Sequence, residues 1–134
     1  MPGISRFFIK AGFIWLLISM GFYGFQQMNP FFRIAYHHTL GIGWVTQMII
    51  GVAIWMFPRW SNELPKGPMW TWWTVLFCLN IGLALRLLSE NFLLQFPSIM
   101  PTIYIVSGVL LWISMLVFIS VMWVRVSPKK TPQS

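Results

Sequence analysis

The chain has 134 residues, of which 57% are hydrophobic and 8% charged, and its formal net charge is +7. Soluble domains carry about 25% charged residues, so this composition excludes a water-soluble globular core. The basic residues lie scattered at the ends of apolar tracts and not in one stripe, which argues against nucleic acid as a partner.

Four tracts without charged residues divide the chain: residues 11–32, 34–58, 67–85 and 91–124. Each is long enough, as a helix, to cross a bilayer core of about 30 Å. Allowing for turns at the prolines, we predict helices near 8–27, 37–57, 69–89 and 101–124. The sequence therefore predicts an all-α membrane protein, with one four-transmembrane-helix bundle over residues 1–126 and a disordered polar tail over 127–134.

The first tract follows Arg6 and Lys10 and so has the charge pattern of a signal peptide. However, Phe22, Tyr23 and Phe25 stand where a cleavage site needs small residues, and the tract is longer than a typical signal core. We expect it to be retained as a membrane helix.

The nine Lys and Arg residues are divided unequally when the chain is threaded through the four spans. Arg33 and Arg86 fall on one side of the membrane, and the other seven fall on the side of the two termini. The positive-inside rule then places both termini in the cytoplasm. We expect a multi-pass protein of a bacterial or archaeal cytoplasmic membrane, with the lipid bilayer as its first partner.

Tryptophans lie mainly near the predicted cytoplasmic side, the side of the two termini. They are Trp60, Trp70, Trp72 and Trp73 around the loop between the second and third spans, and Trp123 at the end of the fourth. Because Trp favours the membrane–water interface, this pattern predicts an aromatic belt.

Adjacent histidines, His37 and His38, open the second span, and a ligand-capable residue in a membrane helix indicates a functional site. They can also have a simpler role, bonding lipid headgroups or closing a helix end. Helical spacing places Gly41 near both, with Gly43 and Gly51 further along the helix. Since small residues let either a flat ring or another helix approach the backbone, a haem slot and helix packing both stay open.

The third span carries three polar residues. Arg86 and Glu90 are four residues apart, which predicts an intrahelical ion pair, although Arg86 also lies at the depth of the histidines, where a guanidinium can hold a haem propionate. Asn80 lies about two turns deeper, and we expect an interhelical hydrogen bond from it to Gln47 or Thr46.

Signatures of hydrolysis and group transfer are missing. The chain has two carboxylates, Glu63 and Glu90, and no Asp. Neither a carboxylate-rich metal site nor a Ser-His-Asp triad can be assembled from one such chain. Its single cysteine, Cys78, excludes an intrachain disulfide. The histidines remain the only strong ligands.

The second span also resembles a known helix. A histidine, then Gly43 and Trp44, then Gly51 and a closing Trp-Met-Phe-Pro-Arg over residues 55–59 resemble the second helix of the catalytic subunit I of haem-copper oxidases, and more closely that of nitric oxide reductases. In that family the helix starts at the outer face, and its histidine is an axial ligand of the low-spin haem b.

The chain resembles still more closely a group of small four-helix membrane proteins related to that subunit. The shared pattern covers most of the chain: Gly-Trp-x-Thr-Gln at 43–47, the segment 51–59, Asn-Ile-Gly at 80–82 with Arg86, and Trp-x-Arg at 123–125. The register against these small proteins favours His38 as the ligand, and the register against the reductases favours His37. We take His38 as the axial ligand and His37 as its neighbour.

The resemblance implies a haem b-binding membrane protein that acts in electron transfer or in sensing a diatomic gas, NO or O2. It places Gly41, Trp44 and Arg86 beside the cofactor. In the full subunit the other haem ligands and the copper-binding histidines lie on helices that this chain does not have, so we do not expect a haem-copper binuclear centre or its enzymatic activity. A second axial ligand would come from another protomer or from a methionine. The methionines considered are Met20, Met28 and Met48.

Two other functions stay open. One is a cofactor-free structural or assembly subunit packed against a respiratory-chain complex. The other is copper handling by the histidines and nearby methionines, a soft ligand set suited to Cu(I), against which the absence of a Met-x-x-Met or Cys-x-x-Cys cluster counts. The glycines of the second span and the single ligand per chain lead us to expect a homodimer.

Overall fold

The structure is a computed structural model that describes residues 2–92 and 95–128. The elements in chain order are α1 (Gly3–Phe25), α2 (Pro30–His38), the π-helix η1 (Thr39–Thr46), α3 (Gln47–Met56), α4 (Met69–Phe92) and α5 (Met100–Val126). Because α2, η1 and α3 form one continuous span, the described chain has four helices that are long and apolar enough to cross a membrane. The predicted all-α, four-helix fold is confirmed. Residues 129–134 of the predicted disordered tail lie outside the described residues.

The first two spans begin earlier than predicted, whereas the third begins at Met69 as predicted and the fourth begins one residue earlier, at Met100. The first starts at Gly3, because the helix continues through the charged residues that precede the apolar tract. The second starts at Pro30, where the Asn29 side chain accepts a hydrogen bond from the Phe31 amide at 3.0 Å. Asn is a favourable N-cap and Pro is favourable at the first helical position. The Asn-Pro pair therefore starts the second helix.

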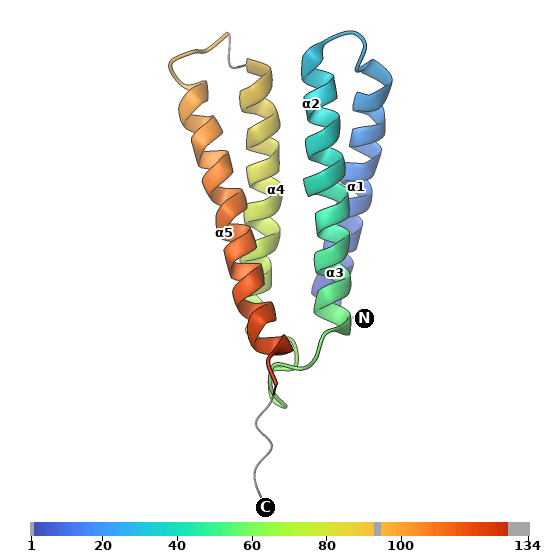
Figure 1. Ribbon diagram of the computed structural model, residues 1–134, viewed down its shortest axis with the longest axis vertical. Helices are drawn as coiled ribbons and strands as arrows, with labels where there is room; N and C mark the ends of the chain where they lie inside the picture. Colours follow the sequence, from blue (N-terminus) through green and yellow to red (C-terminus); the bar gives the residue numbers. More distant parts are fainter. Residues whose placement is uncertain (1, 93–94, 129–134) are drawn as a thin grey trace, which may run out of the picture.

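The four spans form two helical hairpins (Figure 1), α1 with the continuous α2–η1–α3 span and α4 with α5. The hairpins converge at one end, called here the basic end, where α1 begins, α5 ends and the loop of residues 57–68 lies. The opposite end, where α2 begins, is called the histidine end. The two termini of the bundle thus share one end, as the charge pattern predicts. The assignment of that end to the cytoplasm stays a prediction.

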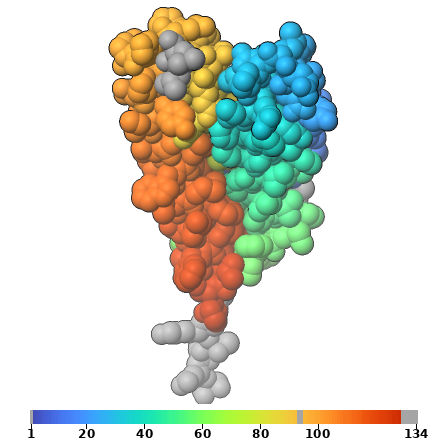
Figure 2. All heavy atoms as spheres, turned by 45° about the horizontal axis from the view of Figure 1, so that its top comes forward, coloured from blue at the N-terminus to red at the C-terminus, as the bar shows by residue number. Residues whose placement is uncertain are grey.

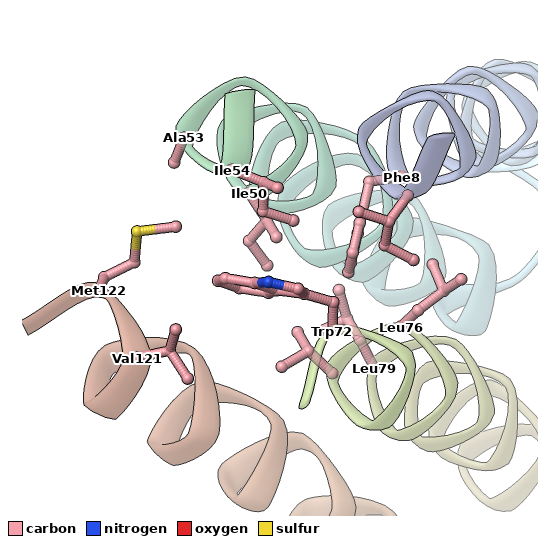
Figure 3. Packing of buried hydrophobic residues seen from close by; sticks show 11 residues of the cluster. Phe8, Ile50, Ala53, Ile54, Trp72, Leu76, Leu79, Val121 and Met122 are labelled. Atoms are coloured by element: carbon pink, nitrogen blue, oxygen red, sulfur yellow. The ribbon is translucent and has the colours of Figure 1, made fainter. Parts of the chain in front are cut away.

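The apolar core lies near the basic end and joins all four spans (Figure 3). Trp72 of α4 is fully buried at its centre. The cluster around it includes Phe8 of α1, Ile50 and Ile54 of α3, and Val121 and Met122 of α5. The Trp72 indole donates a hydrogen bond to the Lys66 carbonyl at 2.8 Å. The prediction that Trp72 belongs to an aromatic belt is therefore wrong, whereas Trp70 and Trp123 are exposed as a belt requires, at 68% and 74%.

The last turn of α3 is capped by a residue from the far end of the chain. Arg125 is 1% exposed, and its guanidinium donates to the carbonyls of Ile54, Phe57 and Pro58 at 3.0, 2.7 and 2.8 Å. The last carbonyls of a helix have no intrahelical donor and carry partial negative charge. Arg125 therefore satisfies them and ties the end of α5 to the end of α3.

A polar network crosses the bundle at mid-depth. Asn80 Oδ1 accepts from Trp15 Nε1 at 2.7 Å and from Gln47 Nε2 at 2.9 Å. Asn80 Nδ2 donates to Gln47 Oε1 at 3.3 Å and to the Leu76 carbonyl at 2.7 Å. The Asn80 side-chain amide thus uses both lone pairs of Oδ1 and both hydrogens of Nδ2. The predicted bond from Asn80 to Gln47 is confirmed, and α1 joins the network through Trp15.

Replacing Asn80 with leucine is expected to lower the free energy of unfolding by about 1–2 kcal/mol, because Trp15 and Gln47 lose their partner inside the bundle. Unfolding in mixed detergent–dodecyl sulfate micelles measures the change. Gln47→Leu and the double variant complete a cycle. If the two single effects add without coupling, the Asn80–Gln47 bond contributes nothing to stability.

Candidate functional site

His38 and Glu90 form a hydrogen-bonded pair at the histidine end. The atoms His38 Nδ1, at the end of α2, and Glu90 Oε2, near the end of α4, are 3.2 Å apart. The pair is partly buried, with side-chain exposures of 32% for His38 and 14% for Glu90. An ionised carboxylate can only accept, so the hydrogen of this bond is on Nδ1, and a neutral imidazole then has a free lone pair on Nε2. The contact links the two hairpins and sets the tautomer of His38.

His37 faces away from this pair. It is exposed, and its ring lies 5.3 Å from that of Tyr36, which in turn lies 5.3 Å from the Tyr23 ring of α1. The structure therefore separates the adjacent histidines, because consecutive helical residues point in different directions. His38 turns toward α4 and His37 toward the outside of the bundle.

The segment that follows the histidines is a π-helix, which the sequence analysis missed. It spans Thr39–Thr46, and the Thr46 hydroxyl donates to the Gly41 carbonyl, five residues earlier, at 2.8 Å. π-Helical segments are rare and are frequently found at functional sites. The two glycines inside this segment were the available sequence signal, because glycine weakens α-helical pairing.

The glycines of this span differ in whether their surroundings suit helix packing or a haem slot, the two roles that the sequence left open. A Cβ on Gly43 would lie 2.6 Å from Trp15 Cγ, and one on Gly51 would lie 3.2 Å from Phe8 Cβ. These two glycines therefore serve helix packing against α1. Gly41 is exposed, and a Cβ there meets no atom within 4 Å. Of the three, Gly41 alone leaves room for a ligand.

Trp44 and Arg86 are held differently. The Trp44 side-chain nitrogen is buried and has no hydrogen-bond partner among the described residues, which is uncommon for a buried donor. The Arg86 guanidinium carbon lies 3.9 Å from the centroid of the Tyr104 ring of α5, a cation–π contact. The predicted Arg86–Glu90 ion pair is therefore wrong, because Arg86 turns toward α5 while Glu90 reaches across to α2.

The methionines considered as a second axial ligand lie in different surroundings. Met48 is ten residues along the span from His38, about 15 Å at the rise of a helix, and its Sδ packs against Gly12. Met28 and Met20 are 76% and 47% exposed. A bundle of one chain thus offers His38 on its own as an oriented nitrogen ligand.

Within residues 2–92 and 95–128, no three His, Cys, Asp or Glu side chains gather as a metal site. Copper handling by the histidines and nearby methionines stays a prediction.

Comparison of the chain with protein-family models, curated proteins and solved structures gives no significant match.

Proposed function

We propose that the protein binds haem b at the histidine end, with His38 Nε2 as the axial ligand. The observation that carries the proposal is the bond between His38 Nδ1 and Glu90 Oε2 at 3.2 Å. Histidines that ligate metals almost always donate their other ring N–H to a carboxylate, a carbonyl or water, which fixes the tautomer and raises the basicity of the ligating nitrogen. Glu90 acts here as the positioning residue for His38.

The surroundings of His38 are compatible with haem on one face of the span and incompatible with it on the other. Gly41, one turn along the span, leaves open space on the exposed face. The unpartnered Trp44 nitrogen is buried, so it is not a donor for a group on that face. The inner face offers no slot, because Trp15 and Leu83 fill the space at Gly43. A planar cofactor would therefore have to lie against the outer surface of the span, and a second protein chain would have to cover its other side.

The coordination number decides between the two roles. If His38 of one chain were the only protein ligand, the bound group would be able to bind a diatomic gas, as a gas sensor requires. If a second protomer also supplied a ligand, the group would be suited to electron transfer. In both roles the chain supplies a basic, oriented nitrogen and an apolar setting, and the iron supplies the redox and gas-binding chemistry.

Absorption spectra of the purified protein, oxidised and reduced, test the proposal. We expect a Soret band that His38→Ala abolishes and His37→Ala leaves largely intact. Glu90→Gln should weaken haem retention at least about tenfold and shift the Soret maximum, because the ligand loses its carboxylate partner. Glu63→Gln, a carboxylate change in the loop at the opposite end, is the matched control.

The remaining outcomes separate the alternatives. Carbon monoxide binding by the reduced protein identifies an open sixth position and favours gas sensing, whereas an unchanged spectrum favours electron transfer. A colourless protein after expression with excess haem, or equal haem content in His37→Ala, His38→Ala and the double variant, refutes haem binding through these residues. The chain is then a cofactor-free packing subunit, a role that the internal His38–Glu90 pair also supports by joining the hairpins.

A further inference from the structure

The basic end carries a group of positive charges, those of Arg59, Lys66 and Arg125. The loop that carries Arg59 and Lys66 also contains one carboxylate, Glu63, which forms no ion pair with any of them among the described residues. Burial lowers the pKa of the Lys66 ammonium, and the nearby charges of Arg125 and then Arg59 lower it further. Among the described residues the one close contact between a carboxylate and a basic side chain is His38–Glu90, at the other end of the bundle. The three cations therefore repel one another without an ion-pair partner, and an external anion would stabilise them.

These cations differ in how accessible they are. Arg125 is buried and committed to the carbonyls at the end of α3. Lys66 is partly exposed, and its Nζ donates to the Trp55 carbonyl at 3.0 Å, which leaves two further hydrogens. Arg59 is exposed in the loop. Lys66 and Arg59 are thus the donors that an external anion can reach, and Arg125 adds to the field that attracts it.

An apolar groove lies between α3 and α5. The surfaces of these two helices meet on the face of the molecule that Figure 2 shows. Its volume is about 480 Å³. Ile49, Ala53 and Phe57 line it from the α3 side, and Phe118, Ile119 and Met122 line it from α5. Apart from Ser127 at its end, the side chains that line the groove are apolar or aromatic.

None of the three basic residues lines the groove, but its lining includes Phe57, whose carbonyl accepts a hydrogen bond from Arg125 and which lies two residues before Arg59. The groove therefore reaches the segment that carries the basic group. Trp123, 74% exposed, also lines it, and tryptophan favours the headgroup level of a membrane. Apolar walls that lead to cations at the interface match a molecule with a hydrocarbon chain and an anionic head.

We propose that this groove and the side chains of Arg59 and Lys66 form a binding site for an anionic phospholipid. One acyl chain lies along Ile49, Ala53 and Ile119, and the phosphate lies at the two cations. Basic pockets between membrane helices bind anionic headgroups in this way. The site is far from His38 and does not depend on haem binding.

Native mass spectrometry of the full chain in detergent tests the headgroup half of the site. The probe is an equimolar mixture of phosphatidylglycerol and phosphatidylcholine with identical acyl chains. We expect the protein to retain phosphatidylglycerol preferentially, and Arg59→Gln and Lys66→Gln each to reduce the preference about fivefold. Arg33→Gln removes the same charge at the opposite end and should leave the preference unchanged. Equal retention of the two lipids, or an equal loss in Arg33→Gln, overturns the proposal.

A second pair of variants tests the groove. Ile119→Trp narrows it and should lower retention of both lipids, whereas Ile105→Trp, on an exposed part of α5 outside the groove, should not. The same spectra report the oligomeric state. If Ile119→Trp converts dimer to monomer without lowering lipid retention, the groove is an interface between two copies and the lipid site is refuted.

Discussion

Arg125→Leu is expected to lower the free energy of unfolding by about 2–4 kcal/mol, because the carbonyls of Ile54, Phe57 and Pro58, one of them in a buried bond and two in partly buried bonds, lose their charged donor together. The same change releases the end of α5 from the end of α3, so the apolar core around Trp72 loosens. Resistance to unfolding in mixed detergent–dodecyl sulfate micelles and the thermal midpoint in detergent both measure the loss.

Two further variants control this experiment. Arg125→Lys keeps the charge but replaces the planar guanidinium with one ammonium, so it should recover part of the stability. Arg33→Leu removes an exposed arginine at the histidine end and should change stability by less than about 0.5 kcal/mol. An Arg125→Leu protein as stable as the wild type contradicts the capping role.

Gly43→Ala is expected to destabilise the bundle by about 1–3 kcal/mol, the usual cost of overpacking a close contact. The added methyl group would lie 2.6 Å from Cγ and 2.7 Å from Cβ of Trp15, and 3.1 Å from Leu83 Cδ2. Because the Trp15 atoms belong to the base of a large side chain, α1 itself must move. That movement also strains the bond from Trp15 to Asn80.

Gly41→Ala is the matched control, two residues away in the same π-helix. A Cβ there meets no atom within 4 Å, and alanine is the better helix former by up to about 1 kcal/mol. We therefore expect Gly41→Ala to be neutral or stabilising in the same thermal measurement. Equal destabilisation by the two changes would mean that the π-helix, and not the contact with Trp15, needs glycine.

The sequence predicted the fold well because the membrane imposes it. Charge-free tracts of sufficient length have to be helices, since no water satisfies their backbone groups. The helix starts at Gly3 and Pro30 were misplaced because charge marks where an apolar tract ends and does not mark where hydrogen bonding ends. The pairing of Asn80 with Gln47 was predictable because a buried amide needs a partner.

The candidate site was less predictable, because its contacts join residues from different spans. Spacing along one helix gave the Arg86–Glu90 pair, but the histidine of another span offered Glu90 a partner, and Tyr104 offered one to Arg86. No local pattern encodes which of two adjacent histidines turns toward α4. The cap formed by Arg125 joins residues 71 positions apart at its longest reach, so spacing within either helix did not reveal it.

The position of that arginine near the end of the chain has a consequence for biosynthesis. When α3 enters the membrane, the donor for its last carbonyls has not yet been synthesised. The carbonyls of Ile54, Phe57 and Pro58 therefore lack the Arg125 donor until the fourth span has been inserted and Arg125 bonds to them. A chain truncated before this residue would keep the four apolar tracts but would lack the bonds that join the end of α5 to the end of α3.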